Sequence, residues 1–571
     1  MAADRDEAEN TVIVGIDFGT TYSGVAFTWS ENIDKMEIIT SWDSDLHSNS
    51  DEKKAPTAIS FGSKGQVTWG YSIPREADQV KWFKLLLLDE DDLPSDVRNS
   101  NKIRAAREYL KKHNKKPVDV ISLFLRHLLN HANQRIIDTI SRSLVNYSKF
   151  HIVMTLPAIW PDYARARMRE AATRAGMLAR RCVAGDTELT FISETEAAAL
   201  ATLVDMDGRK DIEDGDTFVV VDCGGLCGAV FVDEGFVKML QKKFTQECWD
   251  RMKQQSRSRF IHEVWEHGIK AQFDGRDKSK TWTLDKPYES LDRNERRSMD
   301  ELPNITIKAE DVKKAFDLVV DKIYEMVQDQ VRAVNAKKGN NPKYVILVGG
   351  FGRCKYLLES LRDQIEDDIE VLQSRGAGPW TAICRGAVIH AATMKHLYRT
   401  SIEVQTRISR SSYGYYRNKK WDPTRHDAID KYWSNDRQRW SARRQMVWLL
   451  QEGDDISSKK PIKKTLHRLY NLGEKTVKTS SKIYYSTVSP PSPRFNKSVV
   501  QLCTIQWDTQ IDVHSLPTFT NSLGEVFYEL QYEIEMTCSG ASVDFAVYFQ
   551  GKRQGSKNVG VKYEIDNTEA E

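Results

Sequence analysis

Residues 12–29, VIVGIDFGTTYSGVAFTW, decide the fold class of this chain. Two apolar strands flank the turn FGTTYSG, in which Gly19 and Gly24 permit tight turning. The residues between these glycines expose backbone N–H groups with few side-chain obstructions, and such a nest suits the β- and γ-phosphates of a nucleotide. The nest is formed by Thr20, Thr21 and Tyr22.

Asp17 stands at the end of the first of these strands. A carboxylate in this place suits hydrated Mg²⁺, which prefers one or two carboxylates together with water and phosphate oxygens. The stretch also fits an ordinary β-hairpin with a hydroxyl-rich turn, so the rest of the chain has to decide between the two interpretations.

Composition excludes several classes of protein. The 571 residues favour about three to four domains, and 40% hydrophobic with 29% charged residues is ordinary for globular proteins. Lysine plus arginine is 83 and aspartate plus glutamate 81, a net charge of +2, which predicts neither a nucleic acid nor a membrane partner. The polar first residues lack a signal-peptide pattern and the eight cysteines lack a zinc-ligand spacing, so we expect free thiols and the cytosol or the nucleus.

The first 400 residues have the texture of an α/β fold. A short polar tail, residues 1–10, precedes alternating apolar strands and helical patterns that extend over residues 11–397, and several strands end in glycine-rich turns. Residues 398–571 form a separate, largely β domain, because period-2 apolar segments replace the helical ones. Within it, we expect residues 407–433 to be irregular, and residues 489–498, SPPSPRFNKS, to form a loop.

A second strand–turn–helix unit lies at residues 344–362, YVILVGGFGRCKYLLESLR. Gly349 and Gly350 would let the backbone approach a flat base or sugar, and Arg353 could lie along it. Alone, this GGxGR pattern fits a simple helix-opening turn equally well.

Two isolated charged residues are candidates for catalysis. Glu194 precedes a helix of small residues in ISETEAAALA, where it is either a cap or a catalytic acid. Lys84 is a lone lysine in the apolar segment VKWFKLLLL. It either extends to solvent or points into a cleft to meet a γ-phosphate.

Taken together, these pieces resemble the nucleotide-binding domain of the 70-kDa heat-shock chaperone family, within the actin/hexokinase/heat-shock ATPase superfamily. Five motifs occur in the family's order: IDFGTTYSGVAF, MTLPAIWPDYARARMREAATRAG, FISETEAAAL, YVILVGGFGR and TAICRGAVIHAA. The closer resemblance is to a divergent branch with animal and fungal members, whose C-terminal region is similar to SYGYYRNKKWDP and QMVWLLQEGD. The resemblance implies a two-lobed actin-like ATPase domain, with its second lobe at about residues 223–375, followed by a substrate-binding-like β domain.

The resemblance also implies roles for individual residues. Asp17 and Asp222 would hold Mg²⁺, and Lys84, Glu194 and Asp222 would serve hydrolysis. ATP or ADP would be bound by the first turn together with the remaining matched positions, which are Gly224, Gly225, Glu266, Lys270, Gly349, Gly350 and Arg353. Of these, Glu266 would take the ribose hydroxyls and Lys270 would lie near the adenine.

The second phosphate loop departs from the family at residues 220–230, VVDCGGLCGAV. The family continues the acid and glycines with a hydroxyl residue, a second acid and two strands. Here the chain passes from DCGG directly to a segment that resembles the downstream part. We favour a deletion of on the order of 20 to 25 residues. The alternatives are a degenerate loop in which GAVFV forms a short return strand, and an ordinary tight hairpin.

Two further departures weaken the chaperone interpretation. KLLLLDEDD at residues 84–92 resembles the family's acidic leucine linker, but its position inside the first domain predicts core leucines instead. The C-terminus lacks the EEVD-type tail, so we do not expect the usual tail-binding co-chaperones.

These features leave three functional hypotheses. The first is a nucleotide-binding, chaperone-like protein with weak or absent ATPase activity, which binds client polypeptides through the C-terminal domain. The second is a nucleotide-free pseudo-ATPase scaffold that acts through that domain. The third, a sugar or small-molecule kinase, is opposed by TTYS in the first turn and by the β domain.

Overall fold

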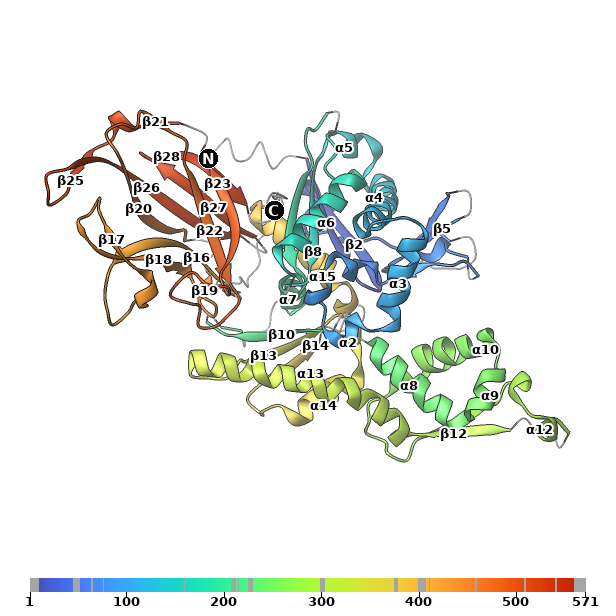
Figure 1. The fold of residues 1–571 in the computed structure, drawn as a ribbon. Helices are drawn as coiled ribbons and strands as arrows, with labels where there is room; N and C mark the ends of the chain where they lie inside the picture. Colours follow the sequence, from blue (N-terminus) through green and yellow to red (C-terminus); the bar gives the residue numbers. More distant parts are fainter. Residues whose placement is uncertain are drawn as a thin grey trace. The chain divides into compact units, whose positions relative to one another are not determined.

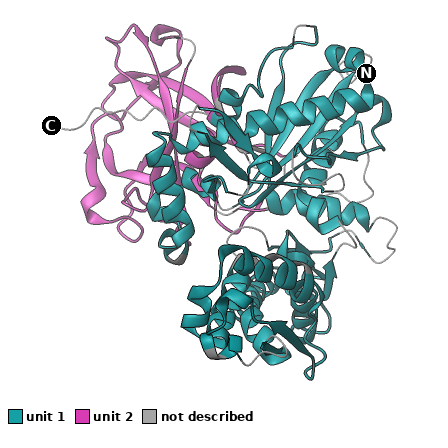
Figure 2. Ribbon diagram, turned by 90° about the vertical axis from the view of Figure 1, so that its right-hand side faces the viewer, with its two compact units in different colours: residues 1–159, 171–402 teal, residues 160–170, 403–571 magenta. Residues whose placement is uncertain are grey.

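The computed structural model describes most of the chain. The described residues are 10–44, 52–62, 65–74, 76–158, 160–181, 183–206, 212–213, 215–223, 229–297, 303–373, 378–398, 407–409, 411–456, 460–507, 510–539 and 542–558. They form a mixed α/β structure that divides into two compact units, 1–159 with 171–402 and 160–170 with 403–571 (Figure 2). The division between the units thus falls near the boundary expected at residue 397, and it adds Trp160–Glu170 to the second unit.

The first unit contains a mixed sheet built around strand β1, which begins the stretch at residues 12–29. Its order is β3-β2-β1-β8-β9, with β4 also paired to β2 (Figure 1). β1 is antiparallel to β2 and parallel to β8, and all of its residues are buried, as its apolar run predicts. The strands are Thr11–Phe18 (β1), Tyr22–Trp29 (β2), Glu37–Ile38 (β3), Ala55–Pro56 (β4), Lys149–Leu156 (β8) and Glu188–Ser193 (β9).

A second sheet of the same unit is parallel and has the order β10-β13-β14, formed by Phe218–Asp222, Tyr344–Val348 and Glu370–Gln373. β13 is buried throughout, and its side chains alternate between two cores. Tyr344, Ile346 and Val348 join the core shared with the first sheet, whereas Val345 and Leu347 join the core on the other face.

β10 pairs with β13 alone among the described strands, and most of its side chains are only half-buried. After Asp222 and Cys223 the next described element is helix α8, Ala229–Phe244. The two alternatives to a deletion disagree with the described residues, because the part of GAVFV from Ala229 onward is helical and forms neither a return strand nor the second strand of a hairpin. Gly228 lies outside the described residues. The deletion stays a hypothesis.

Two helices occupy the space between the sheets, α7 (Glu194–Asp205) and α15 (Gly378–Met394). Glycine permits their close approach. A Cβ on Gly386 would lie 1.6 Å from the carbonyl oxygen of Ala197, and a Cβ on Gly15 of β1 would lie 2.3 Å from that of Cys384. These helices tie both sheets into one core.

The first unit contains further helices and small sheets. The main helices are α3 (Asn101–Lys112), α4 (Pro117–Ile140), α5 (Arg142–Tyr147), α9 (Gln246–Arg251), α10 (Gln254–Arg259), α13 (Ala309–Lys338) and α14 (Lys355–Gln364). The shorter ones are α2 (Ser95–Arg98), α11 (Lys270–Gln272) and α12 (Arg293–Arg297), while α6 (Asp162–Ala175) spans the division between the units. Small antiparallel sheets are formed by Ala58–Phe61 (β5), Val67–Trp69 (β6) and Val80–Lys81 (β7), and by Thr281–Asp285 (β11) and Asn304–Lys308 (β12).

The leucines of KLLLLDEDD belong to the core, as expected. They lie in and beside the 3₁₀ helix Phe83–Leu87, where Leu85 is buried against Trp82 and Ile103, while Leu86 and Leu88 pack at the margin of this cluster. This segment is part of the first unit.

The second unit is mostly antiparallel β-structure, with two principal sheets. One has the order β17-β18-β16-β22-β23, formed by Lys431–Ser434, Arg439–Leu450, Ser412–Lys420, Ser480–Ser486 and Val500–Gln506. The other has the order β20-β26-β27-β28, with β25 (Thr518–Thr520) beside β26; its strands are Ile462–Tyr470, Val526–Ser539, Ser542–Phe549 and Lys552–Asn558. Two-stranded pairs join Arg407–Ile408 (β15) to Asp455–Ile456 (β19) and Thr476–Val477 (β21) to Ile511–Asp512 (β24).

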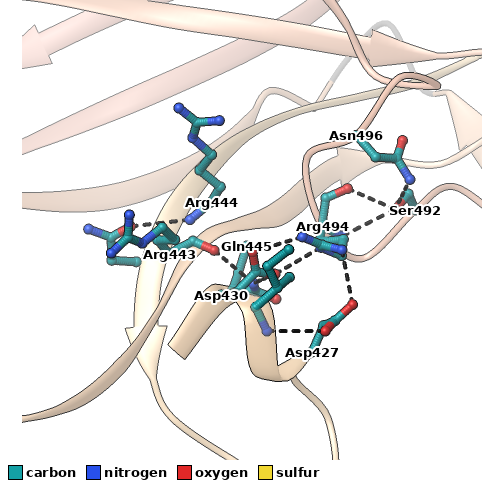
Figure 3. Close-up of polar contacts among 10 residues, drawn as sticks. Asp427, Asp430, Arg443, Arg444, Gln445, Ser492, Arg494 and Asn496 are labelled. Atoms are coloured by element: carbon teal, nitrogen blue, oxygen red, sulfur yellow. Dashed lines mark hydrogen bonds and ion pairs between the residues drawn. The ribbon is translucent and has the colours of Figure 1, made fainter. Parts of the chain in front are cut away.

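The expectation of an irregular segment at residues 407–433 is wrong in part, because β16 occupies the centre of its sheet. The proline-rich segment 489–498 is a loop, as expected, and polar contacts anchor it (Figure 3). Arg494 forms ion pairs with Asp427 at 3.0 Å and with Asp430 at 2.8 Å. Gln445 on β18 donates to the same Asp430 carboxylate at 3.0 Å.

Candidate functional site

The turn between β1 and β2 requires glycine at its first position. A Cβ on Gly19 would lie 2.1 Å from the carbonyl oxygen of Tyr22, so any larger residue would force the turn open. Thr20 is buried, whereas Tyr22 is 39% exposed. The far side of the turn is held by the Thr57 N–H, which donates to the carbonyl of Thr21 at 2.8 Å.

Lys84 points inward to this turn and does not extend to solvent. It is only 1% exposed, on the 3₁₀ helix that follows Trp82, whose backbone is left-handed at φ 66°. Its ammonium donates to the carbonyl of Phe18, at the end of β1, at 2.5 Å, and to the carboxylate of Glu194 at 2.6 Å. The solvent alternative for Lys84 is therefore wrong, and its role at a γ-phosphate stays a prediction.

Glu194 is the first residue of α7 and does not cap the helix. The cap is Ser193, whose hydroxyl accepts the N–H of Glu196 at 3.1 Å. Burial raises the pKa of the Glu194 carboxyl to about 7 against the opposing effect of Lys84, and the nearby charges of Asp222 and Asp17 raise it further. A carboxyl that titrates near neutral pH is suited to acid–base work on a water molecule.

Asp222 stands at the end of β10, where its Cα pairs with that of Val348 on β13. Its electrostatic effect on Glu194 places these two predicted catalytic residues in one region. Gly224 and Gly225, predicted for the second phosphate loop, lie outside the described residues.

Asp17 has a partner that the sequence analysis does not single out. The Lys54 ammonium lies 2.5 Å from the Asp17 carboxylate, and the two side chains are only 6% and 3% exposed. Burial acts to lower the pKa of Lys54, but Asp17, together with Cys384 and Asp222, outweighs this effect, so the pKa is raised overall.

The glycine turn after β13 has the expected backbone. Gly349 adopts φ 81°, in the left-handed region that favours glycine, and Arg353 is exposed at the end of the following 3₁₀ turn. At Gly350 a Cβ would lie 2.8 Å from the ring of Trp380, a second residue that the sequence analysis misses. The Trp380 ring also meets the Tyr22 ring edge-on at 5.4 Å, so one side chain connects the two turns.

Glu266 and Lys270 lie one helical turn apart, in and just after the π-helix Phe260–Ile269. The Lys270 ammonium contacts Asp233 at 2.7 Å and Glu266 at 2.9 Å and is nearly buried. Two carboxylates thus share this ammonium, and its place near an adenine ring stays a prediction. Burial, with Glu266 as the next cause, raises the pKa of Tyr22, so Glu266 lies within electrostatic reach of the first turn.

The described donors do not fit the predicted magnesium ion well. Asp17, the first expected ligand, is ion-paired with Lys54. Asp222, the second, lies at the end of β10, and its role as a ligand stays a prediction. Within the described part of the chain, no cluster of three or more His, Cys, Asp or Glu side chains has an arrangement that could hold a metal. The described ranges also contain no helix with the length and apolar character needed to cross a membrane.

Parts of this chain are similar to known proteins. Residues 407–564 match a family described as "Domain of unknown function (DUF8568)". Human heat shock 70 kDa protein 12B is 28% identical over 222 residues, which are 36% of this chain and 30% of that protein. Heat shock 70 kDa protein 12A is 26% identical over 204 residues in both mouse and human, 33% of this chain and 28% of each relative.

The chain therefore covers less than a third of the length of these curated relatives. The matches support the resemblance that the motifs indicated: this chain is similar, at a distance, to the heat shock 70 kDa protein 12 branch of the 70-kDa heat-shock proteins.

Proposed function

We propose that the first unit is a two-lobed, actin-like ATPase-type domain that binds ATP or ADP. The observation that carries this proposal is the buried Lys84–Glu194 pair at the carboxyl end of β1, held 2.6 Å apart beside a turn that only glycine allows. The two sheets that share the core around α7 and α15 would be the cores of the two lobes.

The site would cradle phosphates with backbone N–H groups of Thr20, Thr21 and Tyr22. The turn at Gly349 and Gly350 would receive the adenosine. Trp380 supports this pairing, because it contacts both Tyr22 and the Gly350 backbone within the first unit.

We propose further that hydrolysis is weak or absent. Phosphoryl transfer depends on positioning and charge stabilisation around the phosphates. The sequence after Asp222 lacks the hydroxyl residue and the second acid of the family's second loop, and residues 223–228 are too few to form two strands before α8. Half of the phosphate clamp would then be missing, which harms hydrolysis more than base recognition.

Calorimetric titration of the full chain with ATP and with ADP tests nucleotide binding. We expect saturable binding that is lost in Gly19→Val, because its side chain would collide with the Tyr22 carbonyl. Gly473→Val is the matched control, since a Cβ there has no neighbour within 4 Å. A wild-type chain that unfolds cooperatively but binds neither nucleotide would contradict the proposal and favour the scaffold hypothesis.

The second unit is the proposed site for client polypeptides, in keeping with the resemblance of its sequence to a substrate-binding domain. Full-length protein added to a thermally unfolding enzyme should delay the enzyme's aggregation, measured by light scattering. Unchanged aggregation at equimolar protein would contradict a chaperone-like role without affecting the proposal for the nucleotide site.

A further inference from the structure

The side chain of Lys54 passes over a glycine of β2 to reach Asp17 at the end of β1. Lys54 immediately precedes β4, which pairs with β2 in the register Ser23 with Ala55. On the other edge of β2, Gly24 pairs with Asp17 of β1. A Cβ on Gly24 would lie 2.9 Å from Cγ and 3.2 Å from Cε of Lys54, so the lysine stem lies flat over this glycine to reach Asp17.

Two groups then fix the position of the ammonium. The Asp17 carboxylate accepts a hydrogen bond from Nζ at 2.5 Å, and the face of Trp380 lies 4.6 Å from Nζ, a cation–π distance. Trp380 also contacts Tyr22 of the first turn and crowds Gly350 of the second. The charge of Lys54 therefore stands between the turn assigned to the phosphates and the turn assigned to the adenosine.

Two lysine ammonium groups lie in this region. Two lysines, Lys54 and Lys84, form ion pairs with Asp17 and Glu194, and both lysines are at least nine-tenths buried. Magnesium is held by one or two carboxylates together with water and phosphate oxygens in near-octahedral geometry, and a carboxylate already bonded to an ammonium at 2.5 Å is less available to the ion or to its waters. An ammonium, by contrast, is a compact point charge with several donors, as in other phosphate sites that use lysine.

Resting on the proposed nucleotide site, we propose that this chain binds adenine nucleotide without a divalent cation and that the Lys54 ammonium supplies the positive charge for the phosphates. Asp17 holds Lys54 in position and is not a metal ligand. Gly24 and Trp380 are positioning residues, since one gives the lysine stem its path and the other supports its charged end.

The test is the affinity of the full chain for ADP, measured by calorimetry in excess Mg²⁺ and again in excess EDTA. We expect the two dissociation constants to agree within about threefold, well below the tenfold that corresponds to 1.4 kcal/mol. Binding in Mg²⁺ that is lost in EDTA would overturn this inference and leave the proposed function intact. Failure to bind in either condition would overturn both.

A variant pair tests the residue itself. Lys54→Met keeps the length of the stem and removes the charge, so ADP affinity should fall by on the order of tenfold to a hundredfold, as for one charge-assisted hydrogen bond. With Asp17 released, part of the affinity should return when Mg²⁺ is added. Lys53→Met is the matched control, because Lys53 is the half-exposed neighbour, and its ADP affinity should equal the wild type.

Unchanged ADP affinity in Lys54→Met would overturn the assignment of Lys54. If that variant fails to fold, judged by its circular dichroism, Lys54→Arg serves instead: it keeps a charge and should keep binding in EDTA. Loss of EDTA-resistant binding in a folded Lys54→Arg would also count against the inference.

Discussion

The ammonium of Lys84 lies 2.6 Å from the carboxylate of Glu194, although 110 residues separate them in the chain. Lys84 comes from a 3₁₀ helix and Glu194 from the start of α7, and both side chains are largely buried, at 2% and 14% exposed. Because this buried pair joins distant parts of the chain, we expect it to stabilise the fold of the first unit and also to fix the two side chains of the candidate site.

Removal of either partner should destabilise the first unit. Lys84→Met leaves the Glu194 carboxyl buried without its counter-ion, so the free energy of unfolding should fall by about 2 to 4 kcal/mol at pH 8, measured by urea denaturation. The double variant Lys84→Met, Glu194→Gln should recover much of this loss. Lys81→Met, at an exposed lysine of the preceding strand, serves as control. Additive losses in the double variant would show that the pair is not coupled.

Gly386 should be intolerant of even one methyl group. A Cβ there would overlap the Ala197 carbonyl at 1.6 Å, so α15 and α7 would have to separate. We expect Gly386→Ala to cost about 2 to 4 kcal/mol of unfolding free energy, measured by urea denaturation. Gly473→Ala, in open space, should change it little. Near-wild-type stability of Gly386→Ala would contradict the close helix contact.

His151 should make the first unit sensitive to acid. It lies on β8, is 2% exposed and shares a hydrogen bond of 2.8 Å with Thr190. Burial lowers its pKa from 6.5 to about 4, with Lys395 and His390 also lowering it and Glu188 opposing. Between these two values the unfolded chain binds more protons than the folded one, so stability falls as the pH is lowered through this window.

His151→Gln should remove this part of the acid sensitivity, which we place at about 1 to 3 kcal/mol between pH 7 and pH 4. Thermal melts across that range measure it. His467→Gln, at an exposed histidine of β20, should leave the pH profile of the first unit unchanged. An identical acid slope in wild type and His151→Gln would contradict the prediction.

In the second unit, Arg494 anchors the proline-rich loop to the buried Asp430 (Figure 3). Arg494→Met should remove the ion pair of the Asp430 carboxylate and keep its hydrogen bond from Gln445. The free energy of unfolding of the unit should fall by about 1 to 3 kcal/mol. This value is smaller than for a fully buried pair because Arg494 is partly exposed. Lys497→Met, at an exposed position of the same loop, is the control. Equal unfolding curves for the two variants would refute the anchoring role.

Local sequence patterns were sufficient for most strands and helices. The apolar run TVIVGIDF coincides with β1, and the small-residue helix begins at Glu194, one residue position before the pattern indicates. The segment 407–433 was harder to interpret, because β16 loses its alternation where consecutive side chains from Arg417 onward face solvent or lie half-buried. Such a strand is stabilised by its neighbours in the sheet and not by its own pattern.

In the candidate site, too, some residues have a local sequence signal and others do not. Lys84 could be singled out because a charge in an apolar segment is locally unusual. Lys54 could not, since it stands in the charged run DEKKAP and resembles a solvent-exposed lysine. The burial of Lys54 depends on Gly24 and Asp17 in other strands. Trp380 lies where side chains or backbone of two turns meet. Contacts between residues that lie far apart in the chain leave no local signal in a single sequence.

Amide hydrogen exchange of the full chain, with and without saturating ADP, tests the central claim most directly. We predict slower exchange at residues 19–24 and 349–353 when ADP is present, because the phosphates order the first turn and the adenosine covers the second. The second unit should exchange at the same rate in both states. Protection confined to residues 407–558, or no protection at concentrations that saturate binding, would contradict a nucleotide site in the first unit.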